Sequence, residues 1–260
     1  MVRDCPNLAY REPLALGAKF TSPTPLHTAA LEQALDDLNA NANVLGVMLI
    51  GSLARGTARQ DSDIDLIVVQ ANGDRITERR QCGPIILECT FRTAAAWTEQ
   101  FTPRQVGDES WGYAFLDGVI LLDADGIVAK LVDRAAKAHA AYQAPKHLVD
   151  HFVWLWNHVR PKMEAVLKRG DATEIGWAAA VMAHPVLQTM WVINDLPLPS
   201  LDLGCVQRHL ADLTRPTEAP TLLREMLQAP PELALRIQLQ VLDTAQSHLE
   251  QQAQLSRPEY

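Results

Sequence analysis

The spacing of apolar residues changes along the chain, and the change falls near residue 143. Before that point, short apolar runs are separated by polar segments and turn residues, which is the pattern of buried strands. We predict these strands at residues 44–50, 64–69, 84–91 and 111–123. The last strand contains the apolar run 119–122 and follows a polar loop that ends at Ser110. After residue 143, apolar side chains recur at helical spacing, and we find no convincing strand.

Helices are predicted in both parts of the chain. The first part has them at residues 22–41, 93–101 and 127–142. The second part has them at residues 146–168, 171–194, 205–213, 220–227 and 231–252. Thr24 is the expected N-cap of the first helix, with Pro25 at its first helical position. Pro161 and Pro185 should kink or break the helices that contain them.

These patterns divide the chain into three segments. Residues 1–21 show no clear period and are expected to form an irregular leader. Residues 22–142 are predicted to form an α/β domain, a mixed sheet with flanking helices, and residues 143–260 an all-helical domain. Within the first domain, residues 71–83 are polar, and Asn72-Gly73 predicts a turn that allows a short helix after it.

The turn after the first strand has the composition of a phosphate-binding loop. It opens with Gly51-Ser52 and contains Arg55. Glycine lets the backbone approach a ligand closely, and free amides beside a hydroxyl can hold phosphate oxygens. Arg55 could neutralise phosphate charge, or it could be a solvated loop cation.

Two acidic residues, Asp63 and Asp65, stand where the second strand begins. Because strand side chains alternate between faces, both project from the same face, with Cα atoms roughly 7 Å apart. Two carboxylates on one face can share a cation, and oxygen ligands suit Mg²⁺. Carboxylates at the start of a strand also cap turns, but a pair on one face after Gly-Ser favours a metal site.

Gly-Ser, ten intervening residues and Asp-Ile-Asp in an apolar strand resemble the signature of the DNA polymerase beta-like nucleotidyltransferase superfamily. The resemblance covers residues 44–91. The general plan, a catalytic domain followed by helices, is similar to that of small-molecule nucleotidyltransferases of the aminoglycoside and lincosamide type. The resemblance implies an enzyme that moves a nucleoside monophosphate from a nucleoside triphosphate, here expected to be ATP, to a hydroxyl. It also implies one or two Mg²⁺ ions held by Asp63 and Asp65.

Glu88 is an acid within the otherwise apolar strand at residues 84–91. Burying an unpaired acid is costly, so such a residue needs a partner, a metal or solvent. In the superfamily, a third carboxylate comes from a strand placed like this one, which implies that Glu88 is a metal ligand, a general base or both. The alternative is that Glu88 lies on an edge strand and faces water.

The expected acceptor is a small hydroxylated molecule bound in the interdomain cleft. A cationic antibiotic would suit a chain of net charge −8. Four acids early in the helical domain could bind such a cation: Asp150, Glu164, Asp171 and Glu174. A protein- or RNA-modifying transferase and a non-catalytic nucleotide-binding protein are the alternatives, and the absence of a basic stripe argues against nucleic acid.

Other function classes and locations are disfavoured by the sequence. It has no G-x-S-x-G, no G-x-G-x-x-G and no Walker lysine after the glycine turn. The four cysteines form no C-x-x-C pair, and we interpret them as reduced, buried thiols of a cytoplasmic protein. We expect neither a signal peptide nor a membrane span.

Overall fold

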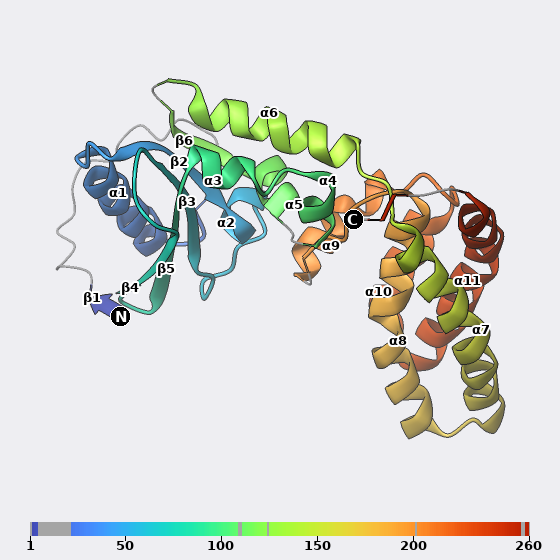
Figure 1. Cartoon of the computed structure of the whole chain (residues 1–260). Coiled ribbons are helices and arrows are strands. Elements are labelled where there is room, and N and C mark those ends of the chain that lie inside the picture. Colours follow the sequence, from blue (N-terminus) through green and yellow to red (C-terminus); the bar gives the residue numbers. More distant parts are fainter. Residues whose placement is uncertain are drawn as a thin grey trace. The chain divides into compact units, whose positions relative to one another are not determined.

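The computed structural model describes residues 2–4, 22–108, 111–123, 125–200, 202–255 and 258–259 (Figure 1). Contacts between Cα atoms divide the chain into two compact units, Met1–His139 and Ala140–Tyr260. The first unit contains a sheet with helices and the second is helical. Each unit is described separately below.

The first unit is built on a six-stranded mixed sheet with the strand order β1-β4-β5-β3-β2-β6. The strands are β1 (Val2–Asp4), β2 (Val44–Ile50), β3 (Ile64–Gln70), β4 (Ile76–Cys82), β5 (Ile85–Thr93) and β6 (Val119–Asp123). The pairs β3–β5 and β1–β4 are parallel and the others are antiparallel. The predicted mixed sheet is therefore confirmed.

Alternate residues of the central strands enter two separate apolar cores on the two faces of the sheet. Leu66 and the alternate residues on either side of it, Ile64 and Val68, pack with α1 (Pro25–Asn39). Leu31 of this helix is fully buried. Ile67 belongs to the opposite core, which includes Trp97 and Phe115. That face is covered by α3 (Ala94–Thr98), α4 (Pro103–Asp108), α5 (Trp111–Asp117) and α6 (Ile127–Ala140) (Figure 1). Burial on both faces explains the continuous apolar runs of β2 and β3.

The start of α1 agrees with the sequence prediction. Thr24 is the N-cap, its side chain accepts a hydrogen bond from the His27 amide, and Pro25 is the first helical residue. His27 itself is fully buried. Its Nε2 lies 2.9 Å from the Ser62 carbonyl oxygen and its Nδ1 lies 2.7 Å from Thr24 Oγ1. Since a carbonyl can only accept, Nε2 carries the proton, and α1 is thereby tied to the residue before Asp63.

Several elements of this unit differ from the sequence prediction. Residues 76–82 form the strand β4, where a polar turn and a short helix were expected; Gly83, with φ +63°, closes the β4–β5 hairpin. The helices α4 and α5 replace a predicted loop and the early part of a predicted strand. Of the predicted irregular leader, residues 2–4 form β1, and residues 5–21 lie outside the described residues.

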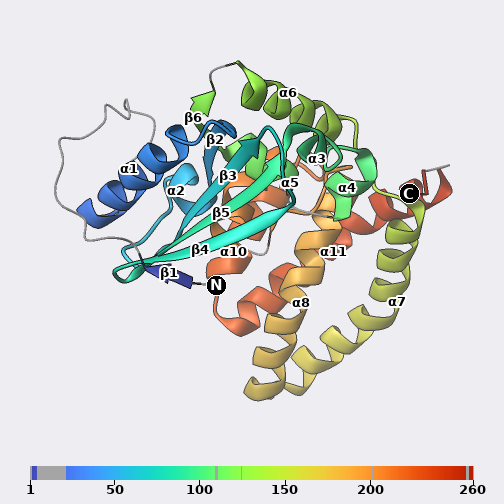
Figure 2. The same cartoon turned by 60° about the vertical axis from the view of Figure 1, so that its left-hand side comes forward.

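The second unit consists of helices. They are α7 (Lys146–Arg169), α8 (Ala172–Ile193), α9 (Leu203–His209), a 3₁₀ turn (Leu210–Asp212), α10 (Ala219–Gln228) and α11 (Pro231–Gln254). Gly170 in a left-handed conformation ends α7 and Asp171 caps α8, so a tight turn joins these two helices (Figure 2). Both α7 and α8 continue through their internal prolines, so Pro161 and Pro185 do not break them.

Buried polar side chains join α11 to α8. The Gln238 amide nitrogen donates to the Ala179 carbonyl oxygen at 2.8 Å, and the Gln252 amide nitrogen donates to the Ile193 carbonyl oxygen at 3.0 Å. Both glutamine side chains are at least 95% buried. Hydrogen bonds of this kind fix the register of two helices, because a shifted helix would leave a buried amide without a partner.

Two further expectations concern the cysteines and the membrane. Cys89 and Cys205 are buried free thiols, as expected, but Cys82 is disulfide-bonded, so the interpretation of four reduced thiols is wrong there. Among the helices of the described residues, none combines the length and the apolar character that a membrane span requires.

Candidate functional site

The predicted phosphate turn forms a very short helix, α2 (Gly51–Arg55), between β2 and β3. Gly51 has φ +73°, a left-handed conformation that glycine adopts without steric cost. Leu53 is 1% exposed and anchors the helix in the core beneath it. Gly56, with φ +72°, ends the helix, and its amide donates back to the carbonyls of Leu53 and Ser52.

Gly51 lies against the carboxylate of Asp65. A Cβ atom at position 51 would lie 2.5 Å from Asp65 Oδ2, closer than a real contact allows. The contact follows from the register, in which Ile50 of β2 is paired with Asp65 of β3. Glycine at position 51 therefore provides both the turn and the space for the carboxylate.

The two strands that carry the predicted acids bring them together. In the parallel β3–β5 pair, Asp65 is directly opposite Glu88. Asp63 immediately precedes β3 and is exposed, whereas Asp65 and Glu88 are half-buried. The three carboxylates thus gather where β3 and β5 begin.

The electrostatics of Asp65 reflect this gathering. The pKa of Asp65 is raised from 3.8 to about 7, chiefly by burial and further by the charges of Asp63 and Glu88. The charges of Arg55 and Arg79 act in the opposite direction and lower the pKa. A carboxylate whose pKa is raised in this way is stabilised in its charged form by an added cation.

Glu88 is not on an edge strand, so the solvent-facing alternative for this residue is wrong. Its strand, β5, lies between β3 and β4. Arg79 of β4 is directly opposite Glu88, and its Nε donates a hydrogen bond to the Glu88 carboxylate. This contact raises the pKa of Arg79 above its usual value.

Sequence reasoning missed Arg79 because it missed β4. The segment 76–82 contains four charged or amide side chains among seven residues, which hides the strand pattern. The available signal was Gly83-Pro84 before the apolar run of β5, which is typical of a hairpin turn.

Arg55 and Ser52 lie where the sequence predicted them, beside the acids. Arg55 is half-buried at the end of α2, and its charge acts on Asp65. Ser52 is in the first turn of α2, and its carbonyl oxygen accepts a hydrogen bond of 2.9 Å from the Thr57 amide. Their roles in holding phosphate, like that of Gly51, stay predictions.

The donor atoms of this site fit a hard divalent cation. Asp63, Asp65 and Glu88 supply oxygen ligands, which Mg²⁺ prefers over nitrogen or sulfur. Burial and the neighbouring charges of Asp63 and Glu88 raise the pKa of Asp65. A bound cation would reduce the repulsion among the three carboxylates. The ligand roles of the three acids nevertheless remain proposals.

The acids predicted to bind a cationic acceptor are engaged in local contacts. The pairs are Lys146 Nζ–Asp150 at 2.7 Å, Arg160 Nε–Glu164 at 3.1 Å, Arg169 Nε–Glu174 at 2.8 Å and the Glu174 amide–Asp171 at 2.9 Å. These exposed carboxylates have partners within the helical unit, and their role in binding a cationic acceptor stays a prediction.

Comparison with known proteins agrees with the geometry of the first unit. Residues 32–90, well short of half of the chain, match the family model described as Polymerase beta, Nucleotidyltransferase. The matched segment includes Gly51, Asp63, Asp65 and Glu88. No curated protein matches the chain.

One similar solved structure is a nucleotidyltransferase-like protein from Exiguobacterium sibiricum 255-15. The TM-score is 0.38 and the identity 12%, over 86% of this chain and 74% of that one. The family match gives a nucleotidyltransferase domain in a nucleotidyltransferase-like fold followed by a helical region. It does not distinguish the aminoglycoside and lincosamide enzymes from other branches.

Substituting Gly51 should cost more than substituting a glycine with the same backbone conformation elsewhere. Gly51→Ala and Gly56→Ala both place a side chain at a φ near +70°, at a cost of about 1–2 kcal/mol. Only Gly51→Ala also collides with Asp65, since nothing lies within 4 Å of a Cβ at Gly56. We expect urea denaturation to show an additional loss of about 1–2 kcal/mol for Gly51→Ala. Equal losses would contradict the close contact.

The raised pKa of Asp65 predicts a specific pH dependence of stability. Because the folded-state pKa of about 7 exceeds the ordinary value of 3.8, the folded state binds the proton more tightly than the unfolded chain. This stabilisation is complete below about pH 4 and is lost as the pH rises through 7. In EDTA, the free energy of unfolding of Asp65→Asn relative to that of the wild type should increase by about 2–3 kcal/mol between pH 5 and pH 8.

The matched control for this experiment is Asp61→Asn. Asp61 is exposed in the same loop, so its substitution should leave the pH dependence unchanged. The measurement is urea denaturation of the three proteins at both pH values. A difference between Asp65→Asn and the wild type that does not change with pH would show that Asp65 is ionised normally.

Proposed function

We propose that the protein is a Mg²⁺-dependent nucleotidyltransferase that moves AMP from ATP to a hydroxyl of a small molecule and releases pyrophosphate. The observation that carries the proposal is the gathering of Asp63, Asp65 and Glu88 beside the Gly51 turn. The family match over residues 32–90 supports the reaction class. The donor nucleotide, the metal and the acceptor are parts of the proposal.

In this proposal, Asp63 and Asp65 hold one or two Mg²⁺ ions, with Glu88 as a further ligand. A metal held by these carboxylates would offset negative charge on the phosphates and on the attacking and leaving oxygens. The main-chain amides at Gly51 and the hydroxyl of Ser52 orient the triphosphate. Arg55, half-buried beside Asp65, contributes positive charge to the phosphate side.

Glu88 has two roles open to it. Its carboxylate, which is paired with Arg79, can bind a metal or accept a proton from the attacking hydroxyl. Arg79 is largely exposed and so is free to exchange Glu88 for a phosphate group. The guanidinium would then compensate for the charge that the nucleotide brings to the site.

Two other functions compete with a small-molecule transferase. One is nucleotidyl transfer to RNA or protein, and the other is nucleotide binding without catalysis. The presence of all three acids argues against the non-catalytic alternative, because binding alone does not require a base. The appended helical unit, Ala140–Tyr260, argues mildly against a compact RNA- or protein-modifying enzyme.

The test is pyrophosphate release from ATP, with and without Mg²⁺, across a panel of acceptors. The panel contains aminoglycosides, lincosamides, bulk RNA and a protein lysate. We expect Mg²⁺-dependent release with a small molecule. Release stimulated only by RNA or protein would overturn the small-molecule proposal, and no release with any acceptor would favour nucleotide binding without catalysis.

Variants of the third acid separate catalysis from folding. Glu88→Gln keeps the shape of the side chain but removes its charge, so turnover should fall by about 10²-fold or more. Glu78→Gln, on the neighbouring strand β4, is the matched control and should retain activity. Full activity of folded Glu88→Gln would exclude a catalytic role for Glu88.

A further inference from the structure

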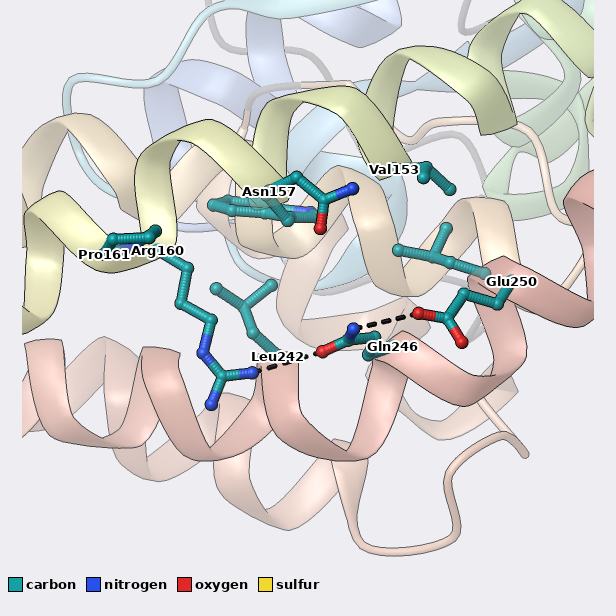
Figure 3. Close-up of a pocket in the computed structure, with 9 residues that line it drawn as sticks. Val153, Asn157, Arg160, Pro161, Leu242, Gln246 and Glu250 are labelled. Atoms are coloured by element: carbon teal, nitrogen blue, oxygen red, sulfur yellow. Dashed lines mark hydrogen bonds between the residues drawn. The ribbon is translucent and has the colours of Figure 1, made fainter.

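A groove lies between α7 and α11 in the helical unit (Figure 3). All of its lining residues belong to that unit: Val153, Trp156, Asn157, Arg160, Pro161, Leu242, Gln246, Leu249 and Glu250. Its volume is about 200 Å³. An apolar cavity of about 150 Å³ in another protein binds benzene, so this groove has room for one ring with a short side chain.

The floor of the groove is apolar and rigidly held. Trp156, Leu242 and Leu249 are each at most 6% exposed. The indole Nε1 of Trp156 donates a 2.8 Å hydrogen bond to Thr189 Oγ1 of α8, which fixes the orientation of the ring. With its only polar atom satisfied away from the groove, the Trp156 ring is suited to packing against an aromatic ligand.

The rim of the groove is a chain of polar side chains that crosses from one helix to the other. Arg160 Nη1 donates to Gln246 Oε1 at 3.2 Å, and Gln246 Nε2 donates to Glu250 Oε1 at 2.9 Å, as Figure 3 shows. Arg160 also forms ion pairs with Glu164 and Asp243. Arg160 is thus more than neutralised, and the rim is negative.

Glu250 is the negatively charged side chain of the rim that a ligand could contact. Within the described residues, it accepts a hydrogen bond from the neutral Gln246 amide and has no cationic partner. Glu250 lines the groove, so its carboxylate can accept hydrogen bonds from a ligand there.

We propose that this groove binds a small aromatic amine, with its ring on Trp156 and its ammonium group at the Glu250 end. An ammonium has three donors and no acceptor, which complements a carboxylate. The ring supplies the apolar surface that the floor requires. The proposal concerns the helical unit alone and does not rest on the proposed nucleotidyl transfer.

Isothermal titration calorimetry with three probes of one shape tests the charge requirement. The probes are 2-phenylethylamine, 2-phenylethanol and phenylacetate, titrated into the full chain. We expect the amine to bind about tenfold more tightly than the alcohol, and phenylacetate to bind more weakly still. No amine binding at millimolar concentration, or equal affinity for the amine and phenylacetate, would overturn the proposal.

Variants place the binding in the groove. Glu250→Gln should weaken amine binding about tenfold without changing that of the alcohol, whereas Glu225→Gln, an exposed glutamate of α10, should change neither. Val153→Phe fills the groove from its wall and should abolish both. If the Val153→Phe protein does not fold, Asn157→Phe is the alternative filling variant, because Asn157 is exposed at the mouth of the groove and a substitution there should be tolerated. Amine binding that survives the filling variant would place the ligand elsewhere and refute the site.

Discussion

Repulsion among three carboxylates is the constraint on which the first unit depends. Asp63, Asp65 and Glu88 are held together where β3 and β5 begin, and Asp65 is buried enough that its pKa rises to about 7. Such an arrangement is unfavourable in isolation, and it persists because the surrounding structure determines it. The parallel register of β3 and β5 fixes two of the acids, and the absence of a Cβ at Gly51 leaves space for Asp65. The cost in stability is offset elsewhere, by the two apolar cores of the sheet.

The two units handle charge differently. In the first, carboxylates are concentrated beside one another and only partly balanced by Arg55 and Arg79. In the second, the acids of α7 and the start of α8 are paired with cations within one or two helical turns. Ion pairs of this kind carry no net charge, so they do not account for the net charge of −8, and that charge by itself does not identify an acceptor.

The sequence predicted those features that depend on local patterns. The apolar runs gave β2, β3 and β5, the Thr24-Pro25 signal gave the start of α1, and helical spacing gave α7, α8 and α11. The catalytic candidates Asp63, Asp65 and Glu88 were also visible, because each is an acid in or beside an apolar strand. That they share one end of the sheet follows from the β3–β5 register.

Other features depend on long-range contacts and could not be predicted. The strand β4 is polar and exists because β5 and β1 pair with it, so its residue Arg79 was missed as the partner of Glu88. His27 looked like an ordinary helix residue, yet it is buried and bonded to the Ser62 carbonyl, 35 positions away. The groove between α7 and α11 likewise joins segments about ninety residues apart.

The central claim is that the gathered carboxylates form a metal-dependent nucleotide site. Calorimetric titration of ATP, with and without Mg²⁺, into the wild type and into a protein carrying both Asp63→Asn and Asp65→Asn tests it most directly. The account predicts much tighter binding with Mg²⁺ for the wild type and no effect of Mg²⁺ for the double variant. Equal ATP affinity in all four titrations would contradict it.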